Sequence, residues 1–269
     1  MKSLRSIKLL LLPVIALSGI FIFLQREGSQ VPSFQSVCDS HRSSDAALMD
    51  RYGVVIHELR VDERVRRLDW VRLRDISPAL LNAVICSEDK RFYGHRGVDW
   101  MALGAAIVKN ITFHDKRGAS TITMQLASIL NKNTPFKRRS LLQKVRQIRD
   151  EREIERCWSK GEILEAYLNL VFFRGELQGI SSASRGLFKK EPHGLNDAES
   201  VVLASLLRAP NASVKDVAKR ACTLGKTMNQ QTDCRVITSI TKEALSLPHF
   251  IKHRKDIAPH VAKRLLRSG

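Results

Sequence analysis

The sequence predicts a mainly α-helical protein organised around one core. Helix-start signals recur along the chain, the apolar residues behind them keep helical spacing, and strand-like composition is confined to a short region near residue 60. The 269 residues are 43% hydrophobic, with only 8 Pro and 14 Gly, which is enough apolar material for one sizeable domain with appendages. This composition excludes a disordered chain.

The N-terminus has the pattern of a membrane anchor. Residues 1–8 carry three basic side chains and precede an apolar run over residues 9–24. The run is shorter than the roughly 20 residues of a typical span, but it can cross a thin bilayer when its flanks reach the interface. Because the apolar stretch continues past a weak cleavage site at residues 16–18, we expect it to stay uncleaved. The sequence therefore predicts a cytoplasmic tail over 1–8 and a transmembrane signal anchor over 9–25, with the remaining chain outside.

Two regions precede the first helix that we expect in the domain. Residues 26–46 are polar and Ser-rich, which predicts a linker. Residues 54–61 and 68–71 have strand-like composition and predict a small β ribbon.

Helix-start signals account for the elements that follow. Ser77 and Pro78 form a cap and first-turn pair that predicts a helix to about Phe92, and Asp99 can cap a second helix that ends near residue 110. Three more helices are predicted by pairs with capping-box spacing, which are Ser140 with Gln143, Ser159 with Glu162, and Asn196 with Glu199.

The C-terminal part over residues 212–269 is basic and is expected to pack on the domain as a helical extension. Helical patterns occur near residues 213–223 and 236–246. Cys222 and Cys234 are close enough in sequence to close a small loop, but the spacing leaves open whether they are bridged.

No CxxC pair occurs, so the sequence predicts no thiolate zinc site. His249 and His253 have the i, i+4 spacing of a metal pair. Lys252 and Arg254 flank His253, and their positive charge disfavours a bound cation, so no other protein metal site is predicted.

The charge balance points to an anionic partner. The chain has 45 Lys and Arg against 27 Asp and Glu, a formal net charge of +18. Nucleic acid, phospholipid headgroups and a pyrophosphate-bearing substrate all fit such a charge, and charge alone does not choose among them.

The segment that starts at Glu88 carries the clearest chemistry. Glu88 and Asp89 end an apolar run, and helical spacing would place Glu88, Phe92 and His95 on one face if the helix continues. A carboxylate at the end of an apolar helix, beside an aromatic ring, is partly desolvated and suited to general acid/base chemistry. The alternative interpretation is a solvated helix end.

Four motifs in order decide between these interpretations. The pattern EDxxFxxHxGxD begins at Glu88, GxSTITxQ ends at Gln125, KxxILxxYLN begins at Lys160, and RAP begins at Arg208. Together these motifs resemble those of the peptidoglycan glycosyltransferases of family 51, and the resemblance extends from about residue 48 to the C-terminus. The chain is similar in organisation to a monofunctional transglycosylase. It looks closest to the glycosyltransferase domain of a class A penicillin-binding protein subgroup, with the transpeptidase domain absent.

The resemblance implies a mainly α, lysozyme-like glycosyltransferase domain over residues 47–211, with a membrane-proximal lobe. The activity it implies is polymerisation of lipid II into glycan strands by inverting transfer, with release of undecaprenyl pyrophosphate. Glu88 would be the general base, and Gln147 stands where the family has a second acid. The substrate-binding positions that it implies are Asp89, Phe92, His95, Ser120, Thr121, Gln125, Arg139, Lys144, Arg146, Tyr167, Asn169 and Arg208.

Two positions depart from the family pattern. Gln147 replaces an acid with an amide, which can orient a phosphate or sugar but supplies no negative charge for a metal. Ser128 stands where the family has Lys or Arg. These departures motivate an alternative, a catalytically weak or inactive scaffold that binds lipid II or glycan. A lytic hydrolase is disfavoured, because a membrane anchor and a basic helix suit a pyrophosphate leaving group.

The resemblance also implies cofactors, partners and location. No cofactor is obligatory, and a divalent cation, Mg²⁺, is allowed at the pyrophosphate. The expected partners are lipid II, the growing glycan strand, membrane phospholipids and other cell-wall synthesis proteins, with no nucleic acid. The expected location is the bacterial inner membrane, with one span and the catalytic domain on the periplasmic side.

Overall fold

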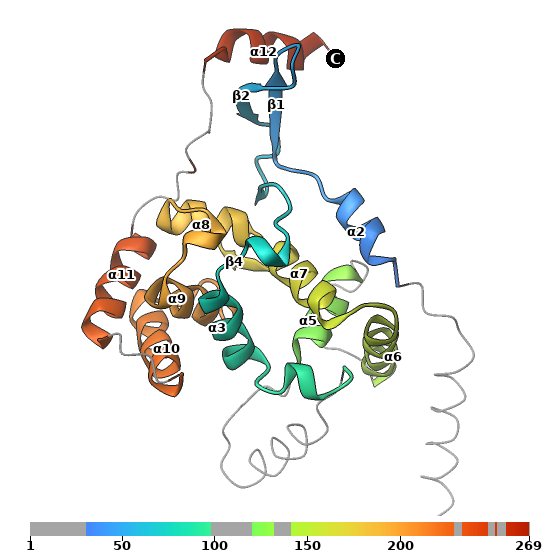
Figure 1. Ribbon diagram of the computed structural model, residues 1–269, viewed down its shortest axis with the longest axis vertical. Coiled ribbons are helices and arrows are strands. Elements are labelled where there is room, and N and C mark those ends of the chain that lie inside the picture. The colour runs from blue at the N-terminus through green and yellow to red at the C-terminus, as the bar shows by residue number, and fades with distance from the viewer. Residues whose placement is uncertain are drawn as a thin grey trace, which may run out of the picture.

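The protein is a mainly helical molecule, as the sequence predicts, and its described residues also form two small β-sheets (Figure 1). The computed structural model describes residues 31–97, 120–131, 141–228, 233–246, 251 and 257–268, with the backbone alone for 141–148 and 266–268. Within these ranges no helix has the length and apolar character needed to cross a bilayer. The anchor predicted over 9–25 and the helix predicted to start at Asp99 lie outside the described residues.

A short helix interrupts the segment predicted as a linker. Helix α2 (Phe34–Ser40) begins at Ser33, whose hydroxyl accepts a hydrogen bond of 3.1 Å from the Ser36 amide. The Phe34 ring packs edge-on against Trp70 and Trp158, with centroid separations of 6.1 and 5.5 Å. The linker prediction over 26–46 is therefore wrong for residues 34–40, because one apolar face finds aromatic partners from distant parts of the chain.

The β ribbon forms, but with a different partner strand. Strand β1 (Asp45–Met49) pairs antiparallel with β2 (Val55–Arg60), which confirms the strand predicted over 54–61. Gly53 in the connecting turn has a φ of +79°, a conformation that glycine adopts without steric cost. The strand predicted over 68–71 is wrong, since this segment is held instead by hydrogen bonds to side chains of α7 (Lys160–Leu170) and α8 (Ile180–Phe188).

A second sheet has three very short strands in the order β3-β5-β4. Strand β3 (Arg66–Arg67) runs parallel to β5 (Leu177–Gln178), and β4 (Phe172–Arg174) runs antiparallel to β5. The sequence did not predict this sheet, because strands of two or three residues carry no periodic signal.

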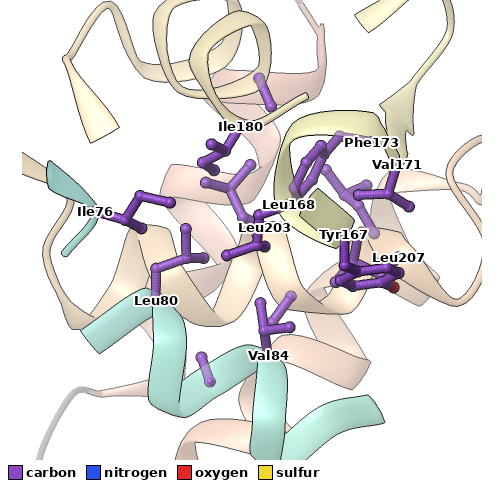
Figure 2. Close-up of a cluster of buried hydrophobic side chains, with 14 of the residues drawn as sticks. Ile76, Leu80, Val84, Tyr167, Leu168, Val171, Phe173, Ile180, Leu203 and Leu207 are labelled. Atoms are coloured by element: carbon purple, nitrogen blue, oxygen red, sulfur yellow. The ribbon is translucent and has the colours of Figure 1, made fainter. Parts of the chain in front are cut away.

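The core lies where α3 (Pro78–Glu88), α7 (Lys160–Leu170), α8 (Ile180–Phe188) and α9 (Asp197–Leu207) meet. Helix α9 is buried from Ala198 to Leu207, so it is the central element. Figure 2 shows side chains from all four helices converging, which are Leu80 and Val84, Tyr167 and Leu168, Ile180, and Leu203 and Leu207.

Local capping signals set the starts of two of these helices. Ser159 and Glu162 form a capping box at α7, and Asn196 and Glu199 form one at α9, so both predictions are confirmed. Helix α3 begins at Pro78 as predicted, but the Ser77 hydroxyl donates to the Leu195 carbonyl at 2.7 Å instead of capping its own helix.

Helix α3 also ends earlier than predicted, at Glu88. Asp89 has a φ of −158°, outside the helical region, because its carboxylate is held by groups beyond the helix. A 3₁₀ turn over Phe92–Gly94 follows, and others lie at Leu73–Asp75 and Pro192–Gly194. The prediction that Glu88, Phe92 and His95 share one helical face is therefore wrong.

The remaining helices cover this core. Helix α5 (Ile122–Leu130) packs against α7 and against α6 (Leu141–Cys157). Helices α10 (Val214–Thr227) and α11 (Cys234–Ser246) pack on α9, and a disulfide between Cys222 and Cys234 joins them. Helix α12 (Pro259–Ser268) lies against β2 at the far end of the molecule (Figure 1). Within the expected C-terminal extension, α10 and α11 contribute buried side chains to the same core.

Candidate active site

Glu88 is the last residue of α3, and two neighbouring side chains hold its carboxylate. Ser87 Oγ donates a hydrogen bond of 2.9 Å to Oε1, and Gln125 Nε2 of α5 donates one of 3.0 Å to Oε2. The side chain is half-buried. An ionised carboxylate has about four lone-pair sites, so two donors fix its orientation and leave capacity to accept a proton.

The buried phenol of Tyr167 and the carboxylate of Glu88 together orient the side chain of Gln125. Its hydroxyl donates a hydrogen bond of 2.9 Å to Gln125 Oε1. Burial, and then the negative charge of Glu88, raise the pKa of Tyr167 well above its usual value, so the phenol remains neutral and able to donate. Since the carboxylate of Glu88 accepts hydrogen bonds, the amide nitrogen must face Glu88 and the amide oxygen must face Tyr167.

Asp89 holds the segment after α3 against the start of α5. It is buried, and both carboxylate oxygens accept from His95 Nε2, at 2.9 and 3.0 Å. Its Oδ2 also accepts from the Ile122 backbone N–H at 3.2 Å, in the first turn of α5, where negative charge is favourable. Asp89 and His95 therefore form a positioning pair.

Thr121 fastens the same segment from its other end. Its hydroxyl donates to the Gly97 carbonyl at 2.8 Å and accepts from the Met124 amide at 3.1 Å as the N-cap of α5. Residues 89–97 are thus tied to α5 at both ends.

A charged cluster links α5, α6 and α7 behind this segment. Glu155 accepts from Thr123 Oγ1 at 2.5 Å and from Lys160 Nζ at 2.7 Å. The Lys160 ammonium also lies 4.5 Å from the centre of the Phe92 ring. Lys160, a motif residue, therefore orders the buried Phe92 by a cation–π contact.

Asn169 has a structural position at the end of α7. Its amide donates to the carbonyls of Val71 and Glu165, both at 2.8 Å, and its oxygen accepts from the Val71 amide at 2.9 Å. Gly179, with a φ of +81°, passes so close that a Cβ there would lie 2.6 Å from the Asn169 carbonyl oxygen.

The predicted site residues differ in how far they are buried and in whether the structure describes them. Phe92, Tyr167 and Asn169 are at most 2% exposed and pack inside the domain, so their contact with substrate stays a prediction. Asp89, His95 and Thr121 also make internal bonds, whereas Gln125 is half-buried beside Glu88, and Ser120 and Arg208 are exposed. Arg139 lies outside the described residues. Lys144, Arg146 and Gln147 belong to α6, but their side chains also lie outside the described part.

Sequence reasoning missed several residues of this network. Ser87 adjoins Glu88, but nothing in its spacing marks it as a donor. Glu155 is one of several acids in a charged helix, and only the fold singles it out. Glu165, which accepts from Trp70 Nε1 and from the Leu73 amide, both at 2.7 Å, occupies an unspecified position of the third motif.

Metal binding finds no support in the described part of the chain. No three His, Cys, Asp or Glu side chains there gather in an arrangement that could hold an ion. Substrate contacts and any cation at a pyrophosphate remain predictions.

The described residues thus form a helical domain in which an amide and a hydroxyl orient the half-buried carboxylate of Glu88. Residues 52–229 match the family model described as transglycosylase. The chain therefore belongs to the transglycosylase family.

Individual relatives carry related names. A biosynthetic peptidoglycan transglycosylase from Mannheimia succiniciproducens is 38% identical over 155 residues, which are 58% of this chain and 62% of that protein. One from Pasteurella multocida is 36% identical over 177 residues, 66% of this chain and 69% of that protein. Penicillin-binding protein 2D from Bacillus subtilis is 37% identical over 145 residues, 53% of this chain and 20% of that protein.

Proposed function

We propose that this protein is a peptidoglycan glycosyltransferase that polymerises lipid II into glycan strands, with Glu88 as general base. The observation that carries the proposal is the half-buried Glu88 carboxylate, held by Ser87 and Gln125 within a family motif. The names of the transglycosylase relatives support the same activity.

In the proposed reaction, a Glu88 oxygen takes the proton of the 4-hydroxyl of the acceptor sugar. The hydroxyl oxygen forms a bond to the anomeric carbon of the growing strand, and the bond from that carbon to undecaprenyl pyrophosphate breaks with inversion. The two hydrogen bonds to Glu88 hold the accepting oxygen in place before the substrate arrives, which lowers the cost of orienting it.

The leaving pyrophosphate gains negative charge as that bond breaks. Fixed positive charge lowers the barrier most at such a point, and we propose that Arg139, Lys144 and Arg146 supply it. A magnesium ion would act at the same place. Because the amide of Gln147 offers such an ion no carboxylate, we propose that the metal is not obligatory. Polymerisation measured with and without EDTA tests this.

The decisive experiment incubates the full-length protein with lipid II and looks for glycan strands by gel electrophoresis. We expect polymer from the native protein and a loss of at least ~100-fold in Glu88→Gln. Glu243→Gln is the matched control, because Glu243 is exposed on α11 and the same change there removes a charge without touching the site. Its activity is expected to equal that of the native protein.

The other outcomes identify the alternatives. Binding of lipid II without any polymer would support the scaffold that Gln147 and Ser128 motivate, and would sink the catalytic proposal. Fragments released from preformed peptidoglycan would indicate a hydrolase. A second variant, Gln147→Glu, shows whether the native amide is a working substitute: a sharp rise in activity would mean that the native enzyme is weakened.

We also propose that residues 9–25 anchor the protein in the inner membrane, with the domain on the periplasmic side in contact with phospholipids and other cell-wall synthesis proteins. The basic flank and apolar run support this orientation. Protease added to spheroplasts should degrade the domain; protection would overturn the orientation.

A further inference from the structure

A groove of about 840 Å³ runs between α10 and α11, on helices that contribute nothing to the hydrogen-bond network of Glu88. Its lining includes Ala218 and Cys222, and small side chains of this kind allow another chain to approach closely. The disulfide from Cys222 to Cys234 pins the two helices together beside it, with Cα atoms 5.3 Å apart. The hollow is therefore a fixed feature of the helix pair.

Four lysines line this groove, and no acidic residue does among the lining residues described. Lys215, Lys219 and Lys226 come from α10, and Lys242 comes from α11. None of these ammonium groups makes an ion pair or hydrogen bond within the described part of the chain, and all four residues are exposed. This contrasts with Lys160 and Lys190, which pair with glutamates.

The spacing of the charges tells what kind of anion fits. Lys215, Lys219 and Lys226 follow one stripe of α10, and a rise of 1.5 Å per residue spreads them over about 16 Å. Charges strung along a line do not converge on a single phosphate. They match an elongated ligand that carries several negative charges in a row.

The concave shape of the groove favours one class of anionic ligand over another. A lipid surface is flat and would leave a hollow between two helices unfilled. An amphipathic peptide places an apolar face in such a groove and its charged side chains along the rims. We propose that the groove between α10 and α11 is a docking site for an acidic segment of a partner protein.

The test uses the full-length protein and a fluorescein-labelled helical peptide of about 12 residues, which spans about 18 Å, with glutamates along its flanks and leucines on one face. Fluorescence anisotropy gives the affinity, and carbodiimide cross-linking followed by peptide mapping locates the contact. We expect saturable binding, cross-links to the four groove lysines, and weaker binding as salt rises. The same peptide with glutamine for glutamate is expected not to bind.

The double variant Lys219→Glu with Lys226→Glu is expected to weaken binding at least ~10-fold. The matched control is Arg64→Glu with Lys263→Glu, which makes the same change in net charge at exposed positions elsewhere. Circular dichroism confirms that both variants fold, and lipid II polymerisation should be unchanged in both.

Three results would overturn the proposal. Equal weakening by the control variant would mean that the peptide senses only the net charge of the chain. Cross-links outside α10 and α11 would place the site elsewhere. The third result has two parts: the native protein binds no peptide but does bind vesicles of phosphatidylcholine with about 30% phosphatidylglycerol, and only the groove variant loses this vesicle binding. That result would make the groove a lipid site.

Discussion

The Tyr167 hydroxyl lies 2.9 Å from Gln125 Oε1, and this bond holds the Gln125 amide with its nitrogen toward the carboxylate of Glu88, the candidate general base. A fully buried residue thus acts on the site through its neighbour. The relationship makes Tyr167 a positioning residue, although its motif alone suggested contact with substrate.

Replacement of Tyr167 by Phe should lower kcat about fivefold while leaving KM nearly unchanged. The change removes only the hydroxyl, so the amide of Gln125 loses the partner that fixes its orientation, at a cost of about 1 kcal/mol. Steady-state kinetics with lipid II measures the effect. Tyr52→Phe is the control, since Tyr52 is 82% exposed. A raised KM with normal kcat would instead mean that the phenol binds substrate.

Replacement of Asp89 by Asn should destabilise the protein by about 2–3 kcal/mol and reduce activity. The carboxylate accepts from His95 and from the Ile122 amide, and an asparagine NH₂ group would meet one of these donors. Urea denaturation measures the free energy of unfolding. At Asp50 the same change should cost under about 1 kcal/mol. A single carboxylate oxygen there accepts the hydrogen bonds from both backbone amides of the turn, and the side chain of asparagine also has one such oxygen. Equal losses at the two positions would contradict the positioning pair.

His41 should make the protein less stable as the pH falls below about 6.5. Burial is the main cause that lowers its pKa in the folded state, and the charges of Arg67 and Arg42 add to it. Its Nε2 donates to the Leu68 carbonyl at 2.8 Å, while the buried Nδ1 has no hydrogen-bond partner among the residues that the structure describes.

The sign follows from proton linkage. At pH values between the lowered pKa of His41 in the folded protein and its unfolded value of 6.5, the unfolded chain binds more protons than the folded one. The contribution of neutral His41 to the free energy of unfolding is therefore fully present above pH 6.5 and is lost as the pH falls toward the folded pKa. Urea titrations between about pH 7.5 and 5.5 should show a smaller loss in His41→Gln than in the native protein. Parallel curves for the two proteins would count against the assignment.

Replacement of Gly179 by Ala should cost more than about 2 kcal/mol of stability. The new Cβ would lie 2.6 Å from the Asn169 carbonyl oxygen, and the backbone also has a φ of +81°. Gly194→Ala is the control, because a Cβ there meets nothing within 4 Å. Thermal unfolding of the two variants gives the comparison, and similar midpoints would refute the close approach.

Reduction of the Cys222–Cys234 bridge should lower stability by about 3 kcal/mol, since it closes a short loop with a sequence separation of 12. Thermal unfolding with and without reductant measures this. The double variant Cys222→Ala with Cys234→Ala should start at the lower midpoint and show no further loss with reductant. A reductant effect in that variant would point to another cause.

Local signals in the sequence predicted the helices whose starts are marked by their own side chains. The capping boxes at Ser159 and Asn196 form as expected because both partners lie within one turn. Helix α2 was missed because its stability depends on Trp70 and Trp158, which no local window contains. The second sheet was missed because its strands of two or three residues are too short to show a periodic pattern.

In the candidate site, too, local motifs were predicted correctly and long-range contacts were not. Its motifs identified Glu88, Gln125 and Tyr167, and the structure joins them in one hydrogen-bonded series. The proposed helical face with His95 failed because Asp89 leaves the helix to accept hydrogen bonds from other parts of the chain. The apolar periodicity of the sequence does not give the end of α3, because hydrogen bonds to distant parts of the chain determine where this helix ends.

The parallel pairing of β3 with β5 also sets an order of events during synthesis. Arg66 pairs with Leu177, and the Leu68 amide donates to Ser182 Oγ at 3.0 Å, so an early part of the chain completes its structure only with a late one. Closing so long a loop is entropically slow. Before α8 has been synthesised, β3 and the Leu68 amide of the nascent chain therefore lack their hydrogen-bond partners. Their backbone groups stay exposed to water or to other proteins.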